Sequence, residues 1–259
     1  MSVYLFVERD SVLHRLDPRP KFLAVVAVIF LAVSSEHPLL PAVLQAGAFL
    51  GIWVAGAWSS LRRVRTVLIA IFLVSLVVWT FVSEGTTTLV GPIELESVLF
   101  GLSTGLKLSA TITASVVWLS TTRNEEITSG FIRMGVPYRV AFAFSSALRM
   151  VPTFVGAGTT IIQAQQSRGL DPESGNVLTR IRKYLPLVVP VFAAALRSAG
   201  QMAMALEARG FGAQKERTSL LQLRMSAVDV VVTTLAVAGM IAGVVIAVGG
   251  HGRLPGLRG

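Results

Sequence analysis

Long apolar runs separated by short charged segments dominate the chain. Most approach the roughly 20 apolar residues that a membrane-spanning helix requires, so the pattern predicts an all-α integral membrane protein. About five spans are predicted, and they cover residues 22–34, 39–58, 67–82, 98–119 and 227–248. The first is short for a span. It follows a segment in which Pro18 and Pro20 favour extended backbone over helix.

Two further apolar runs, 140–162 and 185–206, have an ambiguous pattern. Arg149 and Arg197 interrupt them, and a charge inside a bilayer is costly unless it faces protein or a cavity. We therefore expect two long amphipathic helices that lie partly in the membrane interface and pack across each other as a cytoplasmic platform. Seven spans is the alternative.

This pattern predicts four regions. Four N-terminal spans occupy 1–120, the cytoplasmic or interfacial helices occupy 121–225, a C-terminal span occupies 226–250, and a tail occupies 251–259.

Composition agrees with a membrane protein and excludes several kinds of site. Hydrophobic residues make up 53% of the 259 residues and charged residues only 14%, against about 25% charged in soluble domains. Cysteine is absent, so disulfides and thiolate metal sites are excluded. The three histidines, His14, His37 and His251, are scattered, which argues against an imidazole metal cluster.

The positive charge orients the predicted spans. Of the 23 Lys and Arg residues, 13 fall in 120–225, and the predicted loop after the second span holds Arg62, Arg63 and Arg65. The loops after the first and third spans hold none. The positive-inside rule therefore places the N-terminus and 121–225 in the cytoplasm. This explains the formal net charge of +9 without nucleic acid.

Two helix ends share a small-Arg-Gly pattern: Ser167-Arg168-Gly169 and Ala208-Arg209-Gly210, with the arginines 41 residues apart. Glycine can take the left-handed conformation that closes a helix, and arginine complements the negative helix end. A single such end would need no further role. Its repetition predicts that two exposed guanidinium groups grip a partner. Neighbouring residues expected to support these contacts are Gln163, Gln166, Asp171, Glu207 and Phe211.

Further motifs occur along the chain in a characteristic order. They are Leu13-His-Arg-Leu-Asp-Pro-Arg-Pro-Lys21, Ser120-Thr-Thr-Arg123, Met134-Gly-Val-Pro137, Leu148-Arg-Met-Val-Pro152, Arg180-Ile-Arg182 and Leu185-Pro-Leu-Val-Val-Pro190. With the two Arg-Gly ends, they resemble the transmembrane (T) component of energy-coupling factor transporters, the EcfT/CbiQ-like family. In that family both ends usually read Ala-Arg-Gly. Ser167 departs from this pattern, and the small change is expected to leave docking intact.

The resemblance implies a non-catalytic coupling subunit in the plasma membrane. Arg168 and Arg209 would anchor two coupling-helix ends in two cytoplasmic ABC ATPase subunits, with Gly169 and Gly210 as caps. Motion would pass to a small substrate-binding membrane (S) subunit that imports a vitamin or a transition-metal ion such as cobalt. The chain itself would bind no cofactor, because its partners hydrolyse ATP. The absence of a GxxxxGK[ST] phosphate loop agrees with this expectation.

Three alternatives differ in mechanism. A self-sufficient permease or channel could use Lys107, Arg149 and Arg197 to line a pathway. A conventional ABC permease subunit would usually present one coupling helix per chain, whereas two are predicted here. An intramembrane protease could use Glu125-Glu126, but it would also need intramembrane histidines to hold zinc. All three histidines fall in predicted termini or loops.

Overall fold

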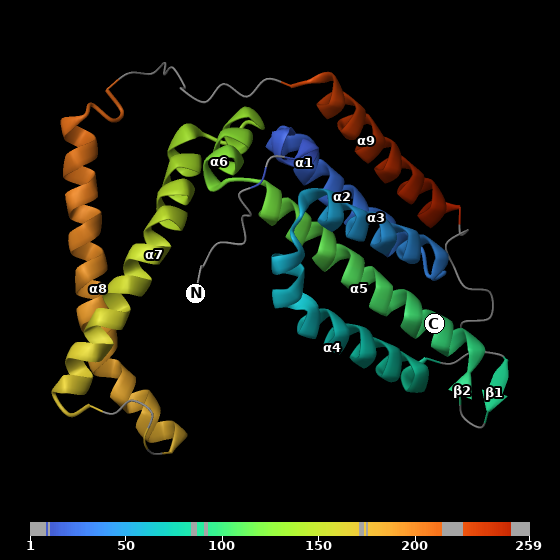
Figure 1. Ribbon diagram of the computed structural model, residues 1–259, viewed down its shortest axis with the longest axis horizontal. Coiled ribbons are helices and arrows are strands. Elements are labelled where there is room, and N and C mark those ends of the chain that lie inside the picture. Colours follow the sequence, from blue (N-terminus) through green and yellow to red (C-terminus); the bar gives the residue numbers. More distant parts are fainter. Residues whose placement is uncertain are drawn as a thin grey trace. The chain divides into compact units, whose positions relative to one another are not determined.

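The computed structural model describes residues 9, 11–83, 87–90, 93–170, 174, 176–213 and 225–249. They form two compact units. The bundle unit comprises Met1–Val136 together with Leu223–Gly259, and the helix-pair unit comprises Pro137–Gln222. Long helices make up most of both units (Figure 1).

The bundle unit brings the last helix of the chain back to the first ones. Its elements are α1 (Val12–Arg15), α2 (Pro18–Ser34), α3 (Leu39–Ala55), α4 (Trp58–Val82), β1 (Thr88–Val90), β2 (Ile93–Glu94), α5 (Leu95–Thr121), α6 (Asn124–Arg133) and α9 (Ala227–Val248). The helix-pair unit consists of α7 (Tyr138–Ser167) and α8 (Val177–Ala208), which pack on each other.

Helix α5 is the centre of the bundle unit and packs against α2, α3 and α4. Small residues permit this close packing, as is usual where lipid surrounds helices. A Cβ atom on Gly105 would lie only 2.9 Å from Cδ2 of Phe72, and one on Gly101 would lie 3.0 Å from the carbonyl oxygen of Leu76. Other small residues buried along α5 include Ser97, Ser103, Ser109, Ala110, Thr113 and Ala114.

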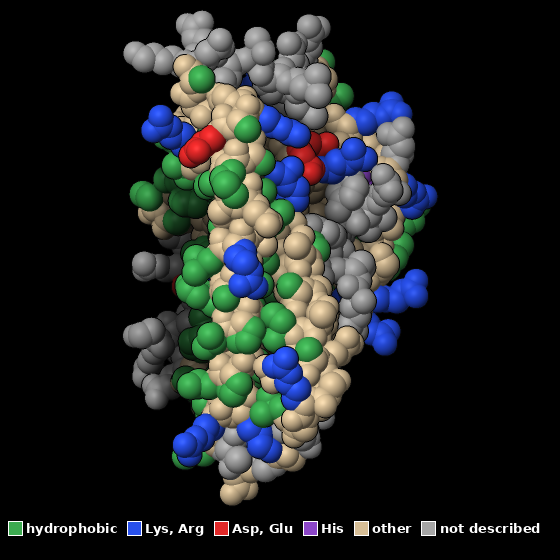
Figure 2. Space-filling model, turned by 90° about the vertical axis from the view of Figure 1, so that its left-hand side faces the viewer, with side chains coloured by type: hydrophobic (Ala, Val, Ile, Leu, Met, Phe, Trp, Pro, Cys, Tyr) green, Lys and Arg blue, Asp and Glu red, His purple; other side chains and the backbone are tan. Residues whose placement is uncertain are grey.

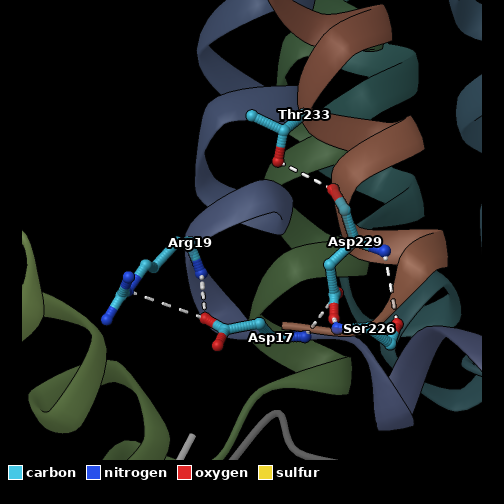
Figure 3. Close-up of polar contacts among 5 residues, drawn as sticks. All are labelled: Asp17, Arg19, Ser226, Asp229 and Thr233. Atoms are coloured by element: carbon cyan, nitrogen blue, oxygen red, sulfur yellow. Dashed lines mark hydrogen bonds and ion pairs between the residues drawn. The ribbon is translucent and has the colours of Figure 1, made fainter. Parts of the chain in front are cut away.

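Asp229 joins the N-termini of α9 and α2 (Figure 3). One carboxylate oxygen accepts the backbone N–H of Asp17 at 2.8 Å, and the other accepts that of Ser226 at 2.7 Å. The Ser226 hydroxyl accepts the Asp229 N–H at 3.3 Å, which completes a capping box on α9. Asp17 in turn caps α2 by accepting the N–H of Arg19 at 3.1 Å. Asp229 is only 1% exposed, so two helix starts 212 residues apart are held by one buried carboxylate.

The start of α2 corrects the predicted extended segment. Pro18 and Pro20 lie in the first turn of α2, behind the N-cap Asp17. Proline is tolerated there because the first-turn N–H groups have no partner within the helix. The prolines therefore begin the helix instead of delaying it.

The predicted loop that carries Arg62, Arg63 and Arg65 is also wrong. Helix α3 ends at Ala55, Gly56 takes a φ of 64°, and α4 begins at Trp58. The left-handed glycine reverses the chain within a short turn, so the three arginines lie in the first turns of α4 instead. The predicted loop 83–97 contains the antiparallel pair β1 and β2.

Within the described residues, five helices are long and apolar enough to cross a membrane: α4, α5, α7, α8 and α9. The all-α membrane fold is confirmed. The five helices that are long and apolar enough are not the same five that were predicted to span, and which helices cross the membrane stays a prediction. Helices α2 and α3 have 17 residues each, about 26 Å at the rise of an α-helix, which is short of a bilayer core of about 30 Å. Helices α7 and α8, predicted as interfacial, have the length and composition of spans.

We predict that Asp229→Asn lowers the free energy of unfolding by about 1–3 kcal/mol, because an amide offers one acceptor oxygen to two backbone N–H groups. The midpoint of thermal unfolding in detergent measures this. Thr233→Val is the matched control, since its hydroxyl donates only to a carbonyl of its own helix. Equal midpoints for Asp229→Asn and the unaltered protein would contradict the role of Asp229.

Candidate docking site at two helix ends

The two Arg-Gly ends have the same backbone conformation. Arg168 follows the last residue of α7 with φ −89° and ψ 8°, and Arg209 follows α8 with φ −90° and ψ 8°. The next residues, Gly169 and Gly210, have φ values of +89° and +71°. The predicted left-handed glycines are confirmed at both ends.

Backbone hydrogen bonds close each end in the same way. At α7, the N–H groups of Leu170 and Gly169 donate to the carbonyls of Gln165 and Gln166 at 3.0 and 2.9 Å. This pair of bonds is a Schellman motif, which satisfies carbonyls that a helix end otherwise leaves open.

The same two bonds occur at α8. There Phe211 donates to Leu206 and Gly210 donates to Glu207, both at 2.9 Å. The backbone at each end is therefore hydrogen-bonded within the chain, and the arginine side chain is the polar group that remains available to bind a partner.

Closure by a left-handed glycine is not itself a docking signal, because α3 and α6 end in the same way. Gly56 and Gly135 have φ values of 64° and 100°. The residues before them are Ala55, which is fully buried, and Met134. Exposed arginine before the glycine is what distinguishes the ends of α7 and α8.

Both arginines are exposed, and within the described chain neither has an ion-pair partner. The Ser167 hydroxyl donates to the carbonyl oxygen of Gln163 at 3.0 Å. It therefore turns back onto its own helix, so serine presents nearly the surface that alanine would. The predicted supporting residues Gln163, Gln166 and Glu207 are exposed as well. Asp171 lies outside the described residues.

An aromatic cluster holds the second end against the start of α7. The Phe211 ring lies 4.6 Å from that of Phe142 and 6.0 Å from that of Tyr138, measured between centroids. Tyr138 and Phe142 stack on each other at 5.9 Å. The equivalent position at the first end is Leu170, which has no ring to contribute. Phe211 was predicted as a supporting residue, but Tyr138 and Phe142 were missed, although their i, i+4 spacing marks one face of a helix.

These contacts place the two arginines far apart. Phe211 packs at the start of α7, whereas Arg168 follows the end of α7, which is 30 residues long. That length corresponds to about 45 Å. Figure 1 shows α7 and α8 crossing between their ends. The structure therefore provides two separate candidate sites, not one composite site.

The helix-pair unit also carries basic side chains between its ends. The face in Figure 2 shows Lys and Arg distributed along its length among hydrophobic side chains. Basic residues of α7 and α8 other than the two end arginines are Arg139, Arg149, Arg180, Arg182, Lys183 and Arg197.

Comparison with known proteins shows a match over most of the chain. The family described as CbiQ, cobalt transport protein, matches residues 9–220. The energy-coupling factor transporter transmembrane protein EcfT of Thermosediminibacter oceani is 32% identical over 245 residues, covering 88% of this chain and 91% of the relative. The protein of the same description from Bacillus selenitireducens is 31% identical and covers 93% and 94%. The one from Bacillus subtilis is 29% identical over 93% and 97%.

We predict that Gly210→Val destabilises the closed end of α8 by about 1–2 kcal/mol, because a side chain with a Cβ is strained at positive φ. A clash would not be the cause, since a Cβ atom on residue 210 would have Cβ of Ala213 as its nearest neighbour, at 3.9 Å. Hydrogen exchange at the amides of residues 210 and 211 should accelerate. Gly210→Asn is the control, because asparagine tolerates this conformation better. Equal exchange rates in both variants would show that strain at residue 210 does not determine the stability of the closed helix end.

Proposed function

The chain belongs to the family of EcfT/CbiQ-like transmembrane components of energy-coupling factor transporters, and on that premise we propose that its two Arg-Gly helix ends dock onto cytoplasmic ATPase subunits. Membership rests on the match over residues 9–220 and on relatives about 30% identical along nearly the whole chain. It makes the chain a multi-pass membrane subunit of a transport complex with other subunits. The docking partners, the coupling mechanism and the transported solute are our proposal.

One observation carries the docking proposal. Two helix ends with the same closed backbone each present an exposed arginine that has no ion-pair partner in the described chain. A planar guanidinium on a rigid end can pair with a carboxylate or with carbonyl groups in a fixed geometry. The rigid end lowers the entropic cost of docking, because the helix terminus is already ordered.

The distance between the ends supports two ATPase partners. Arg168 and Arg209 lie near opposite ends of α7, whose length corresponds to about 45 Å. One subunit that gripped both arginines would need a groove of that length. Two ATPase subunits, each holding one end, need only a local pocket. Closure of the ATPase pair would then move the two ends relative to each other.

The aromatic cluster supports a route for that motion. Phe211 ties the second end to Tyr138 and Phe142 in the first turns of α7. A displacement of Arg209 would therefore move the beginning of α7 with it. The exposed apolar side chains of the helix pair offer a surface through which a membrane partner could receive the motion. Examples are Val140, Phe144, Val151, Leu185, Val188 and Phe192.

We place the solute site on a separate small substrate-binding membrane subunit, as the transporter type implies. The solute would be a vitamin or a transition-metal ion, and cobalt is the one that the family description names. A self-sufficient permease and a conventional ABC permease subunit are the alternatives. Two equivalent helix ends in one chain favour the coupling role over a conventional subunit with one coupling helix. Copurification with two ATPase subunits and a small membrane protein distinguishes it from a self-sufficient permease.

We predict that the double variant Arg168→Glu, Arg209→Glu inserts into the membrane but no longer copurifies with the ATPase subunits. In the proposed complex each arginine pairs with acidic or carbonyl groups of an ATPase subunit, and these groups would repel a glutamate at the same position. The matched control is Arg149→Glu, Arg197→Glu, which makes the same charge change at exposed positions inside α7 and α8, away from the two Arg-Gly ends. Retention of the complex by the first variant would contradict docking. Loss of the complex in both would indicate diffuse charge attraction instead.

We predict that Phe211→Ala lowers solute uptake per ATP hydrolysed while the ATPase subunits still copurify. Removing the ring forfeits aromatic contacts of about 0.5–1.5 kcal/mol each and loosens the second end from α7. Uptake and hydrolysis are measured together in reconstituted vesicles. Leu170→Ala, at the equivalent position of the first end, should leave the ratio nearly unchanged. An equal loss in both variants would remove the special role of the aromatic cluster.

A further inference from the structure

The bundle unit has a half-open cavity of about 440 Å³ between α2, α3 and α5. Almost all of its lining is apolar. The residues that line it are Leu13, Leu16, Lys21, Ala24, Val25, Val28, Val43, Leu44, Gly47, Ala48, Gly51, Ala114, Val117, Trp118, Thr121 and Val232. Exposed apolar grooves mark places where a protein contacts a membrane, a ligand or another protein, so an occupant is expected here.

The lining gives the cavity an elongated shape. Each of the three helices contributes residues three or four apart over two turns, for example Ala114, Val117, Trp118 and Thr121 of α5. Such residues share one face of a helix, so the cavity is a trench parallel to the helices and about 10 Å long. Gly47 widens it, since a Cβ atom there would meet nothing within 4 Å.

The trench has one polar end. The Lys21 ammonium group donates to the carbonyl oxygen of Thr121 at 2.9 Å and lies 3.4 Å from that of His14. The remainder of the lining offers almost no hydrogen-bond partner to water. Three helices of the same unit, α4, α5 and α9, are long and apolar enough to cross a membrane. The surrounding medium is therefore hydrocarbon.

We propose that this trench binds one acyl chain of a membrane phospholipid, with the phosphate group at the Lys21 end. A chain of methylene groups matches the apolar trench in shape. The zwitterionic headgroup of a phosphatidylcholine matches its polar end, where the carboxylates of Asp17, Glu126 and Asp229 lie near the Lys21 ammonium group. A spanning helix of a partner fits less well, because it would need a groove approaching the bilayer thickness of about 30 Å, and this trench covers two helical turns. The proposal is independent of the ATPase-docking function.

Trp118 makes the site measurable, because it lines the trench and packs on Phe22 at 5.4 Å between ring centroids. The full chain is made with Trp53, Trp58 and Trp79 replaced by Phe, which leaves one of its four tryptophans. It is reconstituted in phosphatidylcholine vesicles whose acyl chains carry bromine. We expect strong quenching of Trp118 fluorescence, and loss of that quenching in Gly47→Leu, which fills the trench. Gly156→Leu, at an open position of α7, should keep it.

A second variant guards against misfolding. Val43→Phe narrows the mouth of the trench from a position that is 66% exposed, so the fold should tolerate it, and it should also reduce the quenching. Equal quenching in all variants would overturn the proposal, because bulk lipid would then reach the ring by another path. Absence of quenching in the unfilled trench would overturn it too. Loss of quenching only after partner subunits are added would assign the trench to a protein partner.

Discussion

Backbone hydrogen bonding without water is the constraint on which the rest of this structure depends. In hydrocarbon every N–H and C=O group needs a partner inside the protein. A helix pairs its own backbone groups except in its first and last turns, so the helix ends are where further partners are needed. The buried carboxylate of Asp229 serves the starts of α9 and α2. Lys21 donates to a carbonyl at the end of α5. Left-handed glycines close α3, α6, α7 and α8.

The candidate docking site uses the same kind of helix closure at two ends that we propose to be cytoplasmic. Gly169 and Gly210 close their helices, so the backbone at each end is paired. A change of its conformation would break the hydrogen bonds that close the end. The arginine before each glycine is then presented on a rigid support, exposed and without an ion-pair partner in the described chain. Similar closures at Gly56 and Gly135 lack this arginine, which separates the structural role of the glycine from the binding role that we propose for Arg168 and Arg209.

Local signals in the sequence predicted a large part of this. The last helix was predicted at 227–248 and found there, and the left-handed glycines were predicted from the Arg-Gly pattern. Predictions failed where the result depends on context along the helix. Pro18 and Pro20 were expected to favour extended backbone, yet they occupy the one turn that needs no N–H groups. The interfacial position expected for α7 and α8 stays a prediction, since their length and composition would also suit a span. The contact of Phe211 with Tyr138 and Phe142 joins distant segments, and no local pattern reveals its partners.

The most direct test of docking at the two helix ends uses the natural absence of cysteine from the chain. Single cysteines are placed at Ser167, at Ala208 and, as a control, at exposed Thr153 in the middle of α7. The assembled complex is then treated with a short thiol-to-amine cross-linker. We predict that residues 167 and 208 each cross-link to an ATPase subunit and that residue 153 does not. An intact complex in which neither helix end cross-links, or in which residue 153 does so equally well, would contradict docking at these ends.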